Sequence, residues 1–178
     1  MPRLPACVHY HVGGDGPERQ RIMQAIRHAR VADRVRLLGR LSDAALQRLY
    51  AQADLLVVPN IPVPGDMEGF GIVMLEAGAC GLPAVAARLE GIRDVISEGV
   101  NGHLVESGDA DGFVHIITHL LDNPSTLRSL RIQARQHTLA LYRWDAIAAR
   151  FVQTLSSLRS YRMDAALPSH PPKNATAP

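Results

Sequence analysis

The sequence predicts an α/β protein built on a doubly wound, Rossmann-like parallel sheet. Short apolar runs alternate with segments of helical periodicity from residue 5 to about residue 160. One of the runs, LLVVP at 55–59, is continuously apolar, as strands covered on both faces are. No hairpin signal joins neighbouring strands, so right-handed helical crossovers between parallel strands are expected.

Turn and capping chemistry places the elements of the first half. The strands expected here are 5–12, 35–39 and 55–59. A glycine turn at 13–17 leads into a helix, and Pro17 suits the first helical position because its missing N–H would have no partner there. Ser42 is the expected N-cap of the next helix. The apolar face of that helix consists of Leu46, Leu49, Tyr50 and Ala53.

The second half continues the alternation. A helix over Ile72–Ala79 should end at Gly81, since glycine favours the helix C-terminus and Pro83 prevents continuation. Further elements expected are a strand at 83–87, a turn at Asn101-Gly102, a strand at 103–105, an amphipathic helix over 109–121, and helices from Pro124 and from Trp144 to about Tyr161. Residues 164–178 are rich in Pro and Ala and are predicted to be a disordered tail, which leaves 1–163 as one domain.

Composition limits the classes of function. The net charge of +2, from 19 basic and 17 acidic residues, argues against a nucleic-acid-binding surface. Two cysteines outside any metal-binding spacing indicate a reducing compartment, and no signal peptide or membrane-spanning run is found. A cytoplasmic protein is expected, with peripheral membrane contact left open. The histidine pairs at 9/11 and 115/119 lack further ligands, so no metal site is predicted.

The segment MEGFGIVMLEAGACGLP at 67–83 carries the candidate site. A helix that begins at about residues 70–72 would place free N–H groups and a partial positive charge between Glu68 and Glu76, a setting for a phosphate. Gly69 and Gly71 would let the backbone approach the ligand. Carboxylates repel phosphate but accept hydrogen bonds from hydroxyls, so the pair indicates a nucleotide sugar. The apolar neighbours of Glu76 predict a buried carboxylate; the alternative is that both glutamates are ordinary surface residues.

The sequence resembles the C-terminal, donor-binding domain of retaining GT-B-fold glycosyltransferases of the group 1, or family 4, type. The most specific segment is EGFGIVMLEAGACGLPAV, with its two glutamates. Supporting segments are VGGDGPER at 12–19, DRVRLLGRLSDAALQRLYAQADLLVVP at 33–59, EGVNGHLVESGD at 98–109 and the late Trp144. Together they cover about residues 5–160 in the order of the family.

The resemblance implies a role for each matching residue. Glu68 is implied as the catalytic-site glutamate that contacts hydroxyls of the donor sugar near the reacting carbon. The segment implied to hold sugar and diphosphate through its backbone consists of Gly69, Phe70, Gly71, Ile72 and Val73. Glu76 would hold the ribose hydroxyls, and Arg40 and Leu41 would line the base. No cofactor or metal is implied, because amides and basic side chains neutralise the leaving diphosphate.

The sequence also differs from the family pattern in several places. The GG-x-P-E loop of the family reads Glu90-Gly91-Ile92-Arg93-Asp94 here, which changes the loop and its charge. The arginine and lysine that grip the diphosphate in the family precede this sequence, and Arg88 or Arg93 are the candidate substitutes. The opening strand and the acceptor-binding domain of the family are also missing. The strands at 5–12 and 54–58 would flank that missing strand, so they would pair directly, leave a gap or take a strand from elsewhere.

Two functions of different classes remain from the sequence. The first is donor binding for transfer of a hexosyl group from a nucleotide diphosphate sugar with retention of configuration. Such a fragment is expected to be inactive without an acceptor domain or chain. The second is a non-catalytic nucleotide-binding or interaction module derived from such an enzyme; a sugar-nucleotide epimerase on the same fold is a weaker third. A role in polysaccharide biosynthesis follows only by analogy.

Overall fold

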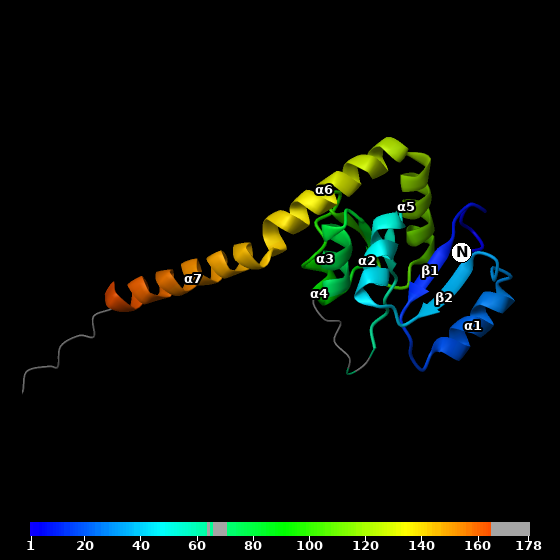
Figure 1. Ribbon diagram of the computed structural model, residues 1–178, viewed down its shortest axis with the longest axis horizontal. Coiled ribbons are helices and arrows are strands. Elements are labelled where there is room, and N and C mark those ends of the chain that lie inside the picture. The colour runs from blue at the N-terminus through cyan, green and yellow to red at the C-terminus, as the bar shows by residue number, and fades with distance from the viewer. Residues whose placement is uncertain (64, 66–70, 165–178) are drawn as a thin grey trace, which may run out of the picture. The chain divides into compact units, whose positions relative to one another are not determined.

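The computed structural model describes residues 1–63, 65 and 71–164, with 158–164 as backbone alone. The strands are β1 (Tyr10–Gly13), β2 (Val35–Gly39), β3 (Leu56–Val58), β4 (Ala84–Ala87) and β5 (Gly102–Val105). The helices are α1 (Arg19–His28), α2 (Asp43–Gln52), α3 (Ile72–Ala79), α4 (Glu90–Arg93), α5 (Ala110–Asp122), α6 (Pro124–Tyr142) and α7 (Trp144–Asp164) (Figure 1). The chain divides into two compact units, 1–140 and 141–178.

All strands of the first unit pair in parallel, as predicted, but they form two sheets rather than one. β1 pairs with β2, and β3, β4 and β5 form a second sheet in that order. No ladder joins β1 to β3 among the described strands. Direct pairing of these two strands, one of the three arrangements expected, is therefore not seen.

The second sheet is the centre of a three-layer core. β4 alternates its side chains between two faces. Val85 and Ala87 pack against a cluster that includes Phe113 and Leu120 of α5. Ala84 and Ala86 face the opposite layer, formed by α3, α4 and the residues after them. All four residues of β4 are buried, so this strand is covered on both faces.

Helices α2 and α3 lie side by side on one face of this sheet (Figure 1). Buried Tyr50, Ala77 and Leu82 form the contact between them. α6 holds the far ends of both helices. Its Arg131 donates a 2.6 Å hydrogen bond to the carbonyl of Ala53 after α2, and its Arg135 donates to the carbonyl of Ala79 at the end of α3. Cations at helix C-termini satisfy free carbonyls and oppose the negative end of the dipole.

Several boundaries differ from prediction because pairing and packing decide them. β1 starts at Tyr10 rather than at residue 5, since only residues from Tyr10 onward align with β2. α1 begins at Arg19, two residues after Pro17, and buries none of its residues. β3 is only half-buried, because it is the edge strand of its sheet. Its side chains still contact both layers, since Val57 packs on the α5 cluster whereas Leu56 and Val58 pack on the α3 and α4 cluster. The prediction that this run is covered on both faces is therefore confirmed, with partial exposure at the edge.

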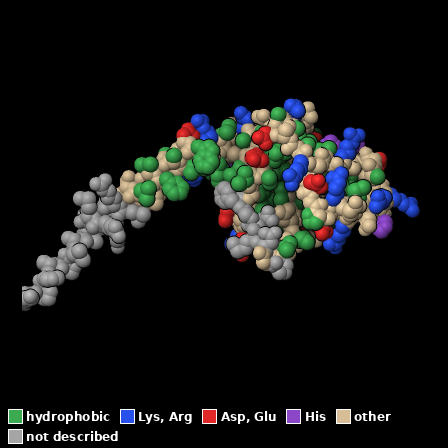
Figure 2. Space-filling model, turned by 60° about the horizontal axis from the view of Figure 1, so that its bottom comes forward, with side chains coloured by type: hydrophobic (Ala, Val, Ile, Leu, Met, Phe, Trp, Pro, Cys, Tyr) green, Lys and Arg blue, Asp and Glu red, His purple; other side chains and the backbone are tan. Residues whose placement is uncertain are grey.

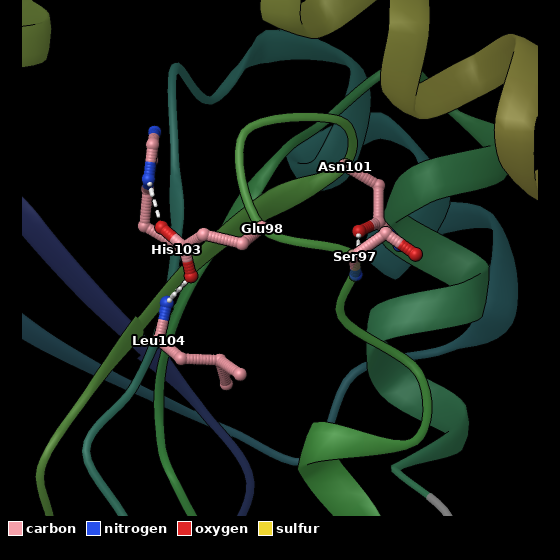
Figure 3. Close-up of polar contacts among 5 residues, drawn as sticks. All are labelled: Ser97, Glu98, Asn101, His103 and Leu104. Carbon is pink, nitrogen blue, oxygen red and sulfur yellow. Dashed lines mark hydrogen bonds and ion pairs between the residues drawn. The ribbon is translucent and has the colours of Figure 1, made fainter.

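The opposite edge of the second sheet is closed by the turn that precedes β5 (Figure 3). One oxygen of Glu98 accepts the N–H of Leu104 at 2.9 Å, and the other lies 2.6 Å from Nδ1 of His103. The carboxylate thus accepts from a backbone N–H group that would otherwise be open to hydrogen bonding with a further strand. Asn101 fixes the same turn by accepting the N–H of Ser97 and donating to the carbonyl of Val95.

The second unit consists of the end of α6 and of α7. α7 carries exposed apolar side chains, and Figure 2 shows hydrophobic side chains gathered along the helix. Trp144, Phe151, Val152 and Leu155 are all more than 60% exposed. Across the described residues, no helix has the combination of length and apolar character needed to cross a bilayer. The predicted tail, residues 165–178, lies outside the described residues.

Candidate functional site

The carboxyl ends of β1 and β2 form a polar cavity of about 340 Å³, lined by Asp15, Gly16 and Arg40. The chain reaches this arrangement through the glycine turn after β1. The N–H of Gly14 donates to the carbonyl of Gly39 at 2.8 Å, which ties the turn to the end of β2. Leu41 lies against Gly13, where an added Cβ would stand 3.2 Å from its Cδ1. The structure therefore brings Arg40 and Leu41, both predicted site residues, to the 13–17 turn.

The second part of the site is the start of α3. Gly71 is the N-cap, with a φ of +67° that glycine adopts freely, and an added Cβ would overlap the methyl group of Met74. The helix begins at Ile72, within the predicted range. Among the described residues, no side chain caps it and no acidic residue lies in its first turn. The first backbone N–H groups of α3 carry a partial positive charge that favours an anion.

The C-terminal end of α3 is closed by two backbone hydrogen bonds. The N–H of Leu82 donates to the carbonyl of Ala77, and the N–H of Gly81 donates to that of Gly78, both at 2.9 Å. With Gly81 at a φ of +75°, this pattern is the Schellman motif. The prediction that Gly81 ends the helix is confirmed. An added Cβ at Gly78 would overlap the hydroxyl of Thr138, so α3 also lies close against α6.

Glu76 lies one turn into α3 and is exposed, not buried as its apolar neighbours predicted. The error has a structural cause: Ile72 and Val73, on the same side of the helix, are also exposed, so that side is not covered by described residues. One carboxylate oxygen of Glu76 is nevertheless held, because the hydroxyl of Tyr50 donates to it at 3.3 Å. The other oxygen is free to accept a hydrogen bond from a ligand.

Tyr50 is the polar residue of this site that the sequence did not reveal. It was expected only as part of the apolar face of α2, and its ring is buried there, at 7% exposed. Burial, with the adjacent Glu76 carboxylate, raises the pKa of Tyr50 to about 12. Part of the shift follows from the same contact, in which the protonated hydroxyl donates to the carboxylate. The contact spans 26 residues, a separation that no local pattern predicts.

The predicted site residues fall into two groups. Arg40 and Leu41 lie at the ends of the first sheet, and Gly71, Ile72, Val73 and Glu76 lie on α3. Among the described residues, no hydrogen bond or ion pair links the two groups. Glu68, Gly69 and Phe70 lie outside the described residues. Both groups follow the carboxyl ends of parallel strands, the edge at which ligands bind in α/β sheets.

Two further arginines stand near this edge. Arg88 directly follows β4, and its Nε donates to Glu106 at 2.8 Å in an exposed ion pair. Arg93 is exposed at the end of α4. Within the described ranges, no group of three or more His, Cys, Asp or Glu side chains is placed to hold a metal ion.

Comparison with known proteins agrees with this arrangement. The family described as Glycosyl transferases group 1 matches residues 4–137. N-acetyl-alpha-D-glucosaminyl L-malate synthase of Bacillus anthracis is 34% identical over 78% of this chain and 34% of its own length. Phosphatidyl-myo-inositol mannosyltransferase of Mycobacterium leprae is 32% identical over 89% of this chain and 41% of its own length. The chain therefore spans well under half the length of these relatives.

Solved structures give the same result for the fold. The Anabaena protein HepE in complex with UDP has a TM-score of 0.76 at 27% identity, over 88% of this chain and 43% of its own. Sucrose-phosphate synthase from Thermosynechococcus elongatus has a TM-score of 0.71 at 31% identity, over 85% of this chain and 38% of its own. The predicted GT-B fold of the C-terminal type is confirmed. This chain belongs to the group 1 glycosyl transferases.

Proposed function

We propose that this chain is the donor-binding half of a glycosyltransferase that moves a hexosyl group from a nucleotide diphosphate sugar with retention of configuration. One observation carries the proposal: the exposed Glu76 carboxylate, held by Tyr50, lies on the helix that starts after Gly71, an N-cap residue without a side chain. Carboxylates accept from hydroxyls and helix starts bind phosphate, which are the two needs of such a donor.

Each predicted residue has a place in this proposal. Glu76 accepts from the ribose hydroxyls, and the cavity at Arg40 receives the base. Amides of Gly71, Ile72 and Val73, with Gly69 and Phe70 before them, hold the diphosphate and sugar. Glu68 contacts the sugar near the reacting carbon. The charge that develops on the leaving diphosphate is stabilised by these amides and by arginine rather than by a metal ion.

Arg93 is a better candidate than Arg88 for the cation that contacts the diphosphate. Arg88 is already paired with Glu106, and a second anion would have to compete for its guanidinium. Arg93 lies at the end of α4, which packs through Ile92 into the same core layer as Met74 of α3. An arginine can bind a phosphate through two parallel hydrogen bonds.

The proposed reaction needs a second surface for the acceptor. We propose that a further domain or a separate chain supplies it, that this chain alone binds donor without transferring it, and that the protein works in the cytoplasm in the synthesis of a polysaccharide or glycolipid. Mixing the chain with a candidate acceptor domain and following transfer from labelled nucleotide sugar tests this part. Analysis of the anomeric configuration of the product by NMR tests retention.

Isothermal titration with UDP, GDP and ADP tests donor binding. We expect weak binding of at least one of them, and Glu76→Ala should raise its Kd at least tenfold, about 1.4 kcal/mol. Asp122→Ala is the matched control, because Asp122 is an exposed helical carboxylate on α5, which covers the opposite face of the sheet. That variant should bind like the native chain.

The results of these titrations distinguish donor binding for transfer from the non-catalytic module. An affinity that is unchanged in Glu76→Ala would refute the ribose role of this residue. Binding that depends on Glu76, without transfer in the presence of any acceptor domain, would favour the non-catalytic module. Failure of all three nucleotides to bind the native chain would refute donor binding altogether.

A further inference from the structure

We propose that Tyr50 is a positioning residue for nucleotide binding: its hydroxyl fixes the Glu76 carboxylate in the orientation that accepts the ribose hydroxyls. The inference rests on the proposed function and adds to it a residue that does not touch the ligand. One contact joins a buried residue to an exposed one. Tyr50 is buried and Glu76 is exposed, yet their oxygens lie 3.3 Å apart. The hydrogen bond thus runs from the core to the surface.

The hydroxyl of Tyr50 is not explained by packing. A buried phenol needs a partner for its O–H, and the described partner is one oxygen of Glu76. A phenylalanine would fill the same space between α2 and α3 without that requirement. What the hydroxyl adds is a fixed direction for a long side chain that would otherwise sample several rotamers at the surface.

The helices on either side of the contact are held firmly. Tyr50 packs on Ala77 and Leu82, which are at most 2% exposed. Arg131 and Arg135 of α6 bind the carbonyls at the ends of α2 and α3. Because both backbones are fixed, the position of the Tyr50 oxygen is fixed as well, and Glu76 is oriented by a rigid donor.

The stoichiometry of the hydrogen bonds suits a diol. A carboxylate offers about four acceptor positions on its two oxygens, and Tyr50 occupies one of them. Two neighbouring hydroxyls, as on ribose, can be accepted by the remaining positions. A tyrosine hydroxyl is protonated at neutral pH, so Tyr50 donates to the carboxylate and leaves the other positions as acceptors.

The test compares ribose with a sugar that lacks its hydroxyls. Tyr50→Phe is titrated with whichever of UDP, GDP and ADP binds the native chain most tightly, and with the 2′,3′-dideoxy form of that nucleotide. We expect Tyr50→Phe to weaken binding of the ribonucleotide about fivefold, the effect of one net hydrogen bond, and to leave the dideoxy form unchanged. Tyr10→Phe, a change of the same kind in β1, should alter neither.

An equal loss for both nucleotides would show a merely structural role for Tyr50 and overturn the inference. No loss for either, with Glu76→Ala still impaired, would overturn it while donor binding stands. No binding by the native chain would overturn both proposals. If Tyr50→Phe does not fold, absorbance titration of Glu76→Gln still tests the contact. Loss of the carboxylate charge should lower the pKa of one tyrosine from about 12, and an unchanged titration would overturn the inference.

Discussion

Asn101 shows how one buried polar side chain fixes the turn before β5 (Figure 3). It is 5% exposed, accepts the N–H of Ser97 at 2.7 Å and donates to the carbonyl of Val95 at 2.9 Å. The sequence identified this position only as half of an Asn-Gly turn. The two hydrogen bonds depend on where the chain after α4 lies, which no local pattern contains.

We expect Asn101→Ala to lower the free energy of unfolding by about 3 kcal/mol, because it leaves both of these buried backbone groups without a partner. Urea unfolding followed by circular dichroism measures the change. Asn123→Ala is the control, since Asn123 also bonds to a backbone carbonyl but in an exposed position at the end of α5. Its cost should be about 1 kcal/mol or less. Equal effects of the two substitutions would contradict this account.

At the scale of elements, the ladder between β4 and β5 depends on a glycine. An added Cβ at Gly102 would overlap the carbonyl of Ala84 in the neighbouring strand, and backbone atoms cannot move aside. We expect Gly102→Ala to destabilise the protein by about 3 kcal/mol or more, measured as a shift of the urea midpoint. Gly16→Ala meets no atom within 4 Å and should leave the midpoint in place. A tolerated Gly102→Ala would show that the two strands can separate.

Elements fixed by local chemistry could be predicted from the sequence. The side chain of Ser42 caps α2 by accepting from Ala45, and Gly81 ends α3. The half-buried state of β3 could not be predicted, because it depends on which strand pairs with its second edge. The exposure of Glu76 is a similar case: an apolar helix is buried only where another element covers it.

On the scale of the whole first unit, the two sheets should differ in local stability. β4 is buried throughout, whereas α1, which connects β1 to β2, buries no residue. We expect amides of Val85 and Ala86 to exchange with solvent far more slowly than those of β1 and β2. Hydrogen exchange followed by mass spectrometry measures the difference. Similar protection in both sheets would show that they open together as one cooperative unit.

The lack of a ladder between β1 and β3 among the described strands also bears on how tightly a ligand can be held. A molecule that touches both the Arg40 cavity and α3 would bridge two blocks that no described backbone ladder aligns. Some of its contact energy would go into ordering those blocks, and the measured affinity would understate the quality of the contacts. Any contact that fixed the two sheets to each other beforehand would remove that cost and so tighten binding without touching the ligand.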